Sequence, residues 1–229
     1  MAVPGGKAAR VIAGQIVRDI TDESLARLPA EAELLKRYQV SRPSLREGMR
    51  LLEMYGVITL KPGPGGGAIV NQVASREFAS TSSLYYNILG LTLRDLMQTR
   101  LHLEPLMARL AAERVKDGTS WDSAEDDAEL DTQTARSNFH LAVARFAGDP
   151  ILVLFAHALR DITLDVLHRE RLPSVAGPEL GISHDQIEEA IRNGQPMKSE
   201  SLMREHVQAY LDYIQQNAPH LLNQVIDWA

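Results

Sequence analysis

The chain has 229 residues, a hydrophobic fraction of 45% and a formal net charge of −6, a composition that excludes a disordered chain and leaves room for two modest domains. No apolar stretch approaches the roughly 20 residues of a membrane-spanning helix, no signal-peptide core opens the chain, and no cysteine is present, so we expect a cytoplasmic protein without membrane contact. Residues 1–75 hold ten Lys and Arg against seven Asp and Glu, leaving about −9 for the remainder, so a basic N-terminal part precedes an acidic body that polyanions would repel.

The first 75 residues predict three helices in succession. Apolar residues at helical spacing predict a helix over 7–22, and a second helix is predicted over 29–38, where a proline stands in or just before the first turn. Ser41 is a natural N-cap for a third helix, and Gly56 ends it. Two short helices joined by a tight turn are typical of a helix-turn-helix.

The third helix and the segment after it predict a DNA reader. The helix carries Arg42, Arg46 and Arg50, and arginine pairs with guanine through two hydrogen bonds that discriminate by about 1–3 kcal/mol. Two short strands are predicted at 57–60 and 68–70, around a tip whose three consecutive glycines permit positive φ angles and a close approach to another surface. We therefore predict a winged helix-turn-helix DNA-binding domain over residues 1–75.

The remainder predicts an all-α domain. Residues 76–83 are small and polar and are predicted to be a linker. Over 84–229, amphipathic segments separated by glycine and proline predict a helical bundle. The predicted helices span about 91–115, 122–147, 150–170, 182–193, 197–216 and 219–228. The fold class is therefore mainly α, with a small β-hairpin wing.

The head resembles the GntR family of bacterial transcription regulators, and the helical remainder resembles the FCD effector domain of its FadR-like branch. The matching positions in the head are Leu28-Pro29, Glu31, Leu34, Val40-Ser41-Arg42, Leu45-Arg46-Glu47, Leu52-Glu53, Gly56 and the glycine wing. Those in the remainder are residues 99–104, Leu110-Ala111-Ala112, Asn138-Phe139-His140, residues 190–194 and Arg204-Glu205-His206.

The resemblance implies that the third helix lies in the major groove of an operator and that the wing reaches the minor groove. The residues predicted to contact DNA are Ser41, Arg42, Ser44, Arg46, Arg50, Gly65, Gly66 and Gly67. One position departs from the pattern, because Ala32 stands after Glu31 where FadR-like proteins often have arginine. The operator sequence of relatives therefore does not transfer to this chain.

The resemblance also implies a metal site, since many FCD domains hold a divalent metal such as zinc with three histidines and an aspartate. His140, His184 and His206 match the histidines, but Arg136 stands where the aspartate is expected. Three possibilities follow. The histidines hold a metal with water or effector oxygens completing its shell; no metal binds and Arg136 pairs with an anionic effector; or Arg136 turns outward and Asn138 or another oxygen substitutes.

Arg100 and Glu104 are spaced by one helical turn. They form either an ion pair on the surface or, as the resemblance implies for Arg100, part of a cavity that holds a carboxylate. The residues predicted to bind a small organic-acid effector are Arg100, Arg136, His140, His184 and His206.

Together these features predict a homodimeric, ligand-responsive DNA-binding regulator. One recognition helix reads only about 3–5 base pairs, so two protomers on a palindromic operator supply adequate specificity. The resemblance favours a repressor that its effector releases. One alternative is a metal-dependent hydrolase or isomerase, although no acid is placed as a general base and no phosphate loop is present. Another is an architectural DNA-binding dimer, which would have a purely apolar helical interior.

Overall fold

The computed structural model describes residues 4–63, 66–71, 75–121, 132–169 and 182–228, with the side chains of residues 4–6, 75, 132–138 and 169 left out of the description. The chain divides into two compact units, Met1–Glu77 and Phe78–Ala229. Each unit has its own hydrophobic core. None of the helices within the described ranges is long and apolar enough to cross a membrane.

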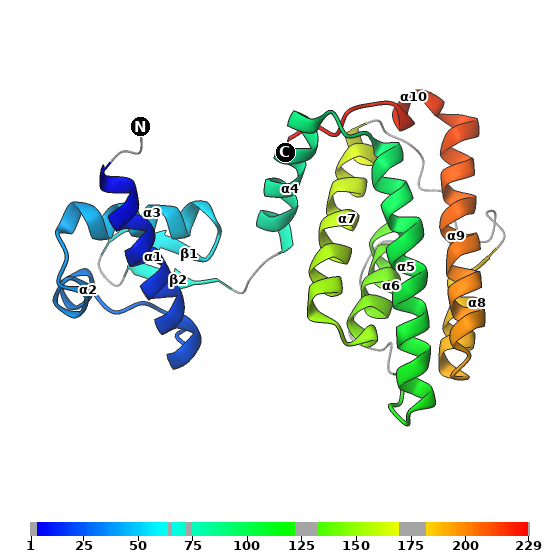
Figure 1. Ribbon diagram of the computed structural model, residues 1–229, viewed down its shortest axis with the longest axis horizontal. Coiled ribbons are helices and arrows are strands. Elements are labelled where there is room, and N and C mark those ends of the chain that lie inside the picture. Colours follow the sequence, from blue (N-terminus) through cyan, green and yellow to red (C-terminus); the bar gives the residue numbers. More distant parts are fainter. Residues whose placement is uncertain (1–3, 64–65, 72–74, 122–131, 170–181, 229) are drawn as a thin grey trace. The chain divides into compact units, whose positions relative to one another are not determined.

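The first unit is a winged helix-turn-helix. Its elements are α1 (Pro4–Glu23), α2 (Glu31–Tyr38), α3 (Arg42–Met54), β1 (Ile58–Lys61) and β2 (Gly67–Val70) (Figure 1). The strands pair antiparallel, with Ile58 opposite Val70. The core forms where α1 crosses α3, and Ile12, Ile16 and Leu45 are fully buried there. The β1–β2 hairpin comes directly after α3, the helix that carries the arginines.

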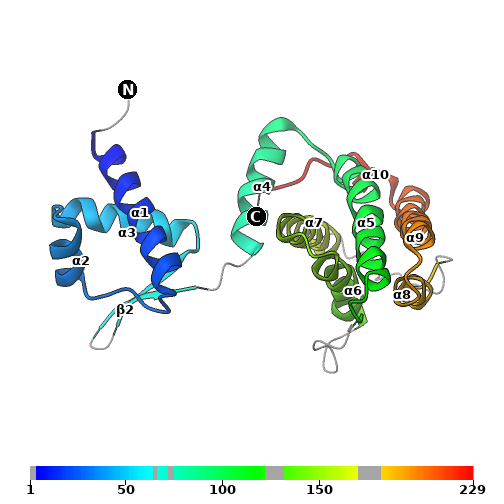
Figure 2. The ribbon, with the colours of Figure 1, turned by 60° about the horizontal axis from the view of Figure 1, so that its bottom comes forward.

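The second unit is all-α among its described residues. Its helices are α4 (Ser75–Leu89, which begins in the first unit), α5 (Leu93–Lys116), α6 (Thr132–Ala147), α7 (Pro150–Arg169), α8 (His184–Arg192), α9 (Pro196–Asn217) and α10 (Pro219–Leu222). Figure 2 shows α5 between α6 and α7 on one side and α8 and α9 on the other, and α5 contacts all four. Side chains of α5 therefore meet those of helices distant in sequence.

Side-chain caps decide where two of the site-bearing helices begin. Thr92 and Asp95 form a reciprocal capping box at the start of α5, each side chain accepting a hydrogen bond from the other's backbone N–H. Ser183 and Gln186 do the same at the start of α8. The second cap makes His184 the first residue of α8. The His184 ring faces the neighbouring helices.

The structure confirms the predicted fold class but differs at residues 76–83, which lie in α4 rather than in a linker. Ala79 and Ser83, one turn apart, are buried, and Phe78 packs edge-on against Phe155 with ring centroids 5.7 Å apart. The small residues thus allow close helix packing. Composition alone does not distinguish a helix of this kind from a linker. The first ten residues of the helix predicted over 122–147 lie outside the described part of the chain.

Candidate functional site

The first turn of α3 is held by hydroxyl groups. Gln39 ends α2 in the left-handed conformation, with φ +50°, and the chain then turns into Ser41, the N-cap of α3. Ser41 Oγ accepts a hydrogen bond from the Ser44 backbone N–H at 3.3 Å and lies 2.8 Å from Ser44 Oγ. This cap satisfies the Ser44 N–H and sets the direction in which α3 begins.

Two arginines of α3 share one carboxylate. Glu31, the first residue of α2, lies 3.2 Å from Arg42 Nε and 3.2 Å from Arg46 Nη2. The two arginine side chains are 66% and 62% exposed, so both guanidinium groups face solvent while Glu31 orients them. The spacing of the sequence did not predict this bridge. Arg50, 75% exposed, lies 3.7 Å from Glu47, one turn back on the same helix.

The wing is built on glycine and on a third segment of backbone. A side chain at Gly66 would place its Cβ 2.2 Å from the carbonyl oxygen of Lys61, so only glycine fits there. Arg27 donates a hydrogen bond from Nη1 to the Gly66 carbonyl at 3.0 Å, and its backbone forms a bridge with Ile69. Of the three glycines predicted to form the wing tip, Gly65 lies outside the described residues.

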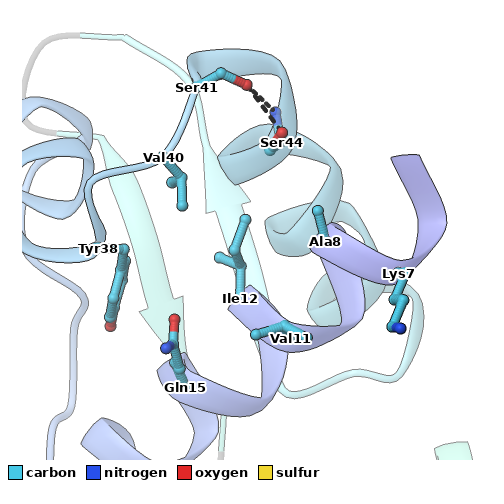
Figure 3. Close-up of a pocket in the computed structure, with 9 residues that line it drawn as sticks. All are labelled: Lys7, Ala8, Val11, Ile12, Gln15, Tyr38, Val40, Ser41 and Ser44. Atoms are coloured by element: carbon cyan, nitrogen blue, oxygen red, sulfur yellow. Dashed lines mark hydrogen bonds between the residues drawn. The ribbon is translucent and has the colours of Figure 1, made fainter. Parts of the chain in front are cut away.

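An open groove of about 530 Å³ lies between α1 and the start of α3 (Figure 3). Val11, Ile12 and Val40 supply apolar surface, and Ser41 lies at one end. Lys7 is the one charged side chain among the described residues that line it. The groove thus lacks a cluster of converging polar groups and belongs to the packing of α1 on the helix-turn-helix.

In the second unit, three helices bring the predicted histidines together. His140 comes from α6, His184 from α8 and His206 from α9, and one nitrogen of each lies within 4.8 Å of the others. The Nε2 atoms of His184 and His206 are 3.2 Å apart. His206 Nδ1 lies 2.8 Å from the Ile182 carbonyl, to which it donates a hydrogen bond, so its Nε2 carries the lone pair.

This geometry fits a divalent metal. Tetrahedral zinc at about 2.0–2.1 Å from each nitrogen places neighbouring nitrogens about 3.3 Å apart, and the His184–His206 separation matches. Burial, together with the neighbouring His140, lowers the pKa of His206 to about 4, so its imidazole is neutral near pH 7, as metal binding requires. Phe139 stacks on His184 at 4.2 Å and limits the rotation of that ring. The three imidazoles would hold the metal between α6, α8 and α9.

A buried ion pair adjoins the histidines. Arg100 Nε donates to Glu104 Oε1 at 2.5 Å, and the two side chains are only 12% and 9% exposed. Glu104 Oε2 lies 2.7 Å from His140 Nδ1, although the angle is not that of a regular hydrogen bond. Burial alone would raise the pKa of Glu104, but Arg100 and then His140 hold it well below its usual range, and Glu104 is ionised. The pair is therefore intrahelical, as the spacing predicted, but it lies inside the domain.

The side chains of Arg136 and Asn138 lie outside the description, although their backbone belongs to α6. The three possibilities for the missing aspartate therefore stay predictions. Sequence reasoning paired Glu104 with Arg100 but missed its contact with His140. That contact depends on how α5 packs against α6, for which the sequence carries no local signal.

These features define a two-domain DNA-binding protein with a winged helix-turn-helix and an all-α domain that encloses a histidine cluster. Residues 8–67 match the family described as "Bacterial regulatory proteins, gntR family", and residues 95–209, half of the chain, match the FCD domain. The chain belongs to the gntR family of bacterial transcription regulators, in the branch that carries an FCD domain. The predicted class, a DNA-binding regulator and not an enzyme, is thereby confirmed.

Several relatives resemble the chain over most of its length. The HTH-type transcriptional regulator YcbG of Bacillus subtilis (strain 168) is 28% identical over 200 residues, covering 82% of this chain and 80% of the relative. The HTH-type transcriptional repressor NanR of Enterobacter sp. (strain 638) is 27% identical over 205 residues, covering 79% and 74%. A solved structure, Streptococcus agalactiae GntR, has a TM-score of 0.61 at 19% identity and covers 88% of this chain and 98% of its own, which shows the shared fold.

Proposed function

We propose that this protein is a homodimeric repressor whose hold on its operator is released when a small organic acid binds inside the FCD domain. The observation that carries the proposal is the convergence of three imidazoles beside a buried arginine, in the domain attached to a DNA-reading head. Relatives named as NanR repressors support repression as the direction of control. As a bacterial DNA-binding regulator it would act in the cytoplasm, where its operator lies.

On the DNA side, the exposed arginines of α3 would enter the major groove and the wing would follow the minor groove. The residues proposed to contact DNA are Ser41, Arg42, Ser44, Arg46, Arg50, Gly65, Gly66 and Gly67. In the protein without DNA, Glu31 would orient the guanidinium groups of Arg42 and Arg46, which are one helical turn apart on α3. A two-fold pair of heads would then read a palindromic operator.

On the effector side, Arg100 is a cation beside the three imidazoles, and Arg136 would add a second positive charge, so an anionic ligand fits the cluster. The residues proposed to bind the effector are Arg100, Arg136, His140, His184 and His206. The three histidines would also hold a divalent metal such as zinc, which when bound supplies positive charge for a carboxylate oxygen. Effector binding releases DNA only to the extent that the ligand prefers the arrangement of heads that cannot bind the operator.

The architectural alternative is less consistent with the domain interior. It requires a purely apolar bundle, whereas Glu104 and His206 are both buried and Arg100 lies beside them. Buried ionic groups are costly unless they are paired. Their presence at one place in the bundle favours a binding site over a simple dimerisation core.

The first experiment is metal analysis of protein purified without a chelator or a histidine tag, combined with thermal-shift titrations of small carboxylates. Near-stoichiometric zinc or a similar ion, lost in His140→Ala, would support the metal site with three histidine ligands. Stabilisation by an acid without any metal, dependent on Arg136, would support the arginine as its replacement. Neither metal nor stabilisation by any carboxylate would contradict the proposed effector site.

The second experiment measures release from DNA. The wild-type protein selects a duplex from a random pool, and the stabilising carboxylate should then lower its affinity for that duplex. His206→Ala should bind the duplex normally but fail to respond, whereas His168→Ala, an exposed control on α7, should respond as wild type does. An unchanged response in His206→Ala would remove that residue from the site.

A further inference from the structure

Glu104 contacts Arg100 and His140, two residues of the proposed effector site, but it is not one of the three histidines whose nitrogens converge. Its Oε1 accepts a hydrogen bond from Arg100 Nε at 2.5 Å, and its Oε2 lies 2.7 Å from His140 Nδ1. The atoms able to hold a metal come from the three histidines, and Glu104 contacts one of these residues without being a member of the group. Its carboxylate thus joins α5 to the imidazole that α6 contributes.

An ionised carboxylate accepts hydrogen bonds and donates none, which constrains the histidine that faces it. His140 Nδ1 must carry a proton to approach Glu104 Oε2 at 2.7 Å without repulsion. In the neutral imidazole the other nitrogen, Nε2, then bears the lone pair. Without an acceptor at Nδ1, both tautomers of His140 would be open.

A second histidine of the cluster also has an oxygen atom at its Nδ1, in this case in a regular hydrogen bond. His206 Nδ1 is held by the Ile182 carbonyl at 2.8 Å, which leaves Nε2 facing His184. Two of the three imidazoles therefore have an oxygen atom close to Nδ1, a hydrogen-bonded backbone carbonyl at His206 and the Glu104 carboxylate at His140. Acceptors of this kind orient metal-binding histidines in proteins and typically change metal affinity 10- to 100-fold.

We propose that Glu104 is a positioning residue of the effector site, which holds His140 in the Nδ1-protonated form and ties it to Arg100. The inference rests on the proposed function for its purpose, but its structural content is independent of any ligand. Glu104 also places a negative charge beside the histidines, in a chain whose position 136 carries arginine where an acid is expected. Because Glu104 contacts both groups, an anion that shifts the Arg100 guanidinium would also shift the His140 imidazole.

The test removes the acceptor without leaving a buried charge. Replacing one partner of a buried ion pair is strongly destabilising, whereas replacing both by apolar residues of similar volume is tolerated. The variant is therefore Arg100→Met/Glu104→Met. Its matched control is Glu188→Met/Arg192→Met, which removes a pair of the same residue types at the same spacing on α8. Thermal unfolding checks that both variants fold.

Two measurements decide the proposal. Long-range nitrogen–proton spectra of the histidine rings, with His140 assigned from His140→Ala, report its tautomer in protein without metal. The Nδ1-protonated form should predominate in the wild type and the control, and Arg100→Met/Glu104→Met should show a mixture of the two tautomers. Zinc affinity, measured by competition with a chelating dye, should fall 10- to 100-fold in the same variant only.

Unchanged tautomer signals in Arg100→Met/Glu104→Met would overturn the positioning role. A wild-type protein that binds no zinc would contradict the metal part of the proposed function instead, and the tautomer comparison would still decide the role of Glu104. The two failures are therefore distinguishable.

Discussion

Replacing Arg46 by alanine should weaken DNA binding strongly while leaving the fold intact. The side chain is 62% exposed and its partner Glu31 keeps Arg42, so the free energy of unfolding should change by no more than about 1 kcal/mol. Each arginine paired with a guanine contributes roughly 1–3 kcal/mol of discrimination. A dimer loses two such contacts, or roughly 2–6 kcal/mol, which corresponds to a fall in affinity of about 30-fold to more than 10,000-fold.

Fluorescence anisotropy with the selected duplex, at several salt concentrations, measures this effect. A loss larger on the selected duplex than on random DNA identifies a base contact, whereas an equal loss with a shallower salt dependence identifies a phosphate contact. Lys36→Ala, which removes an exposed cation from the last turn of α2, is the control for net charge. Wild-type affinity in a folded Arg46→Ala dimer would refute the assignment of α3 as the DNA reader.

Three further predictions concern the head and the histidine cluster. Glu31→Gln should lower the ratio of the affinity for the selected duplex to that for random DNA. Arg42 and Arg46 lose the carboxylate that orients them, and the DNA phosphates lose a negative charge that repels them. An unchanged ratio would count against Glu31 as the residue that orients the two arginines. Gly66→Ala should weaken DNA binding without changing the unfolding of the FCD domain, since the added Cβ would lie 2.2 Å from the Lys61 carbonyl oxygen and the wing must rearrange; normal binding would show that the wing tip tolerates another backbone path. Metal-free protein should lose stability as the pH falls from 6.5 to about 4, because His206 stays neutral when folded but is protonated when unfolded. The loss is up to roughly 3 kcal/mol, and urea unfolding at both ends of that range should show it in the wild type but much less in His206→Gln.

Most of the DNA-binding head could be predicted because its signals are local. The serine cap of α3, the glycine that ends it and the glycines of the wing each act within a few residues of themselves. The same local reasoning failed for residues 76–83, where small polar side chains indicated a linker. Their role in α4 depends on which neighbour covers Ala79 and Ser83, and composition does not encode that neighbour.

The sequence by itself determined the class of protein, most of its helices and both wing strands, and the residue types of the two proposed sites. Only the tertiary structure decided which of those side chains meet. Glu31 joins two arginines because α2 and α3 pack with a particular rotation, and Glu104 reaches His140 because α5 crosses α6 at one depth. Caps, turns and helical faces follow from residues within about one turn of each other. Contacts between helices depend on rotation and separation that many distant side chains determine together, and these contacts orient the groups of the proposed effector site.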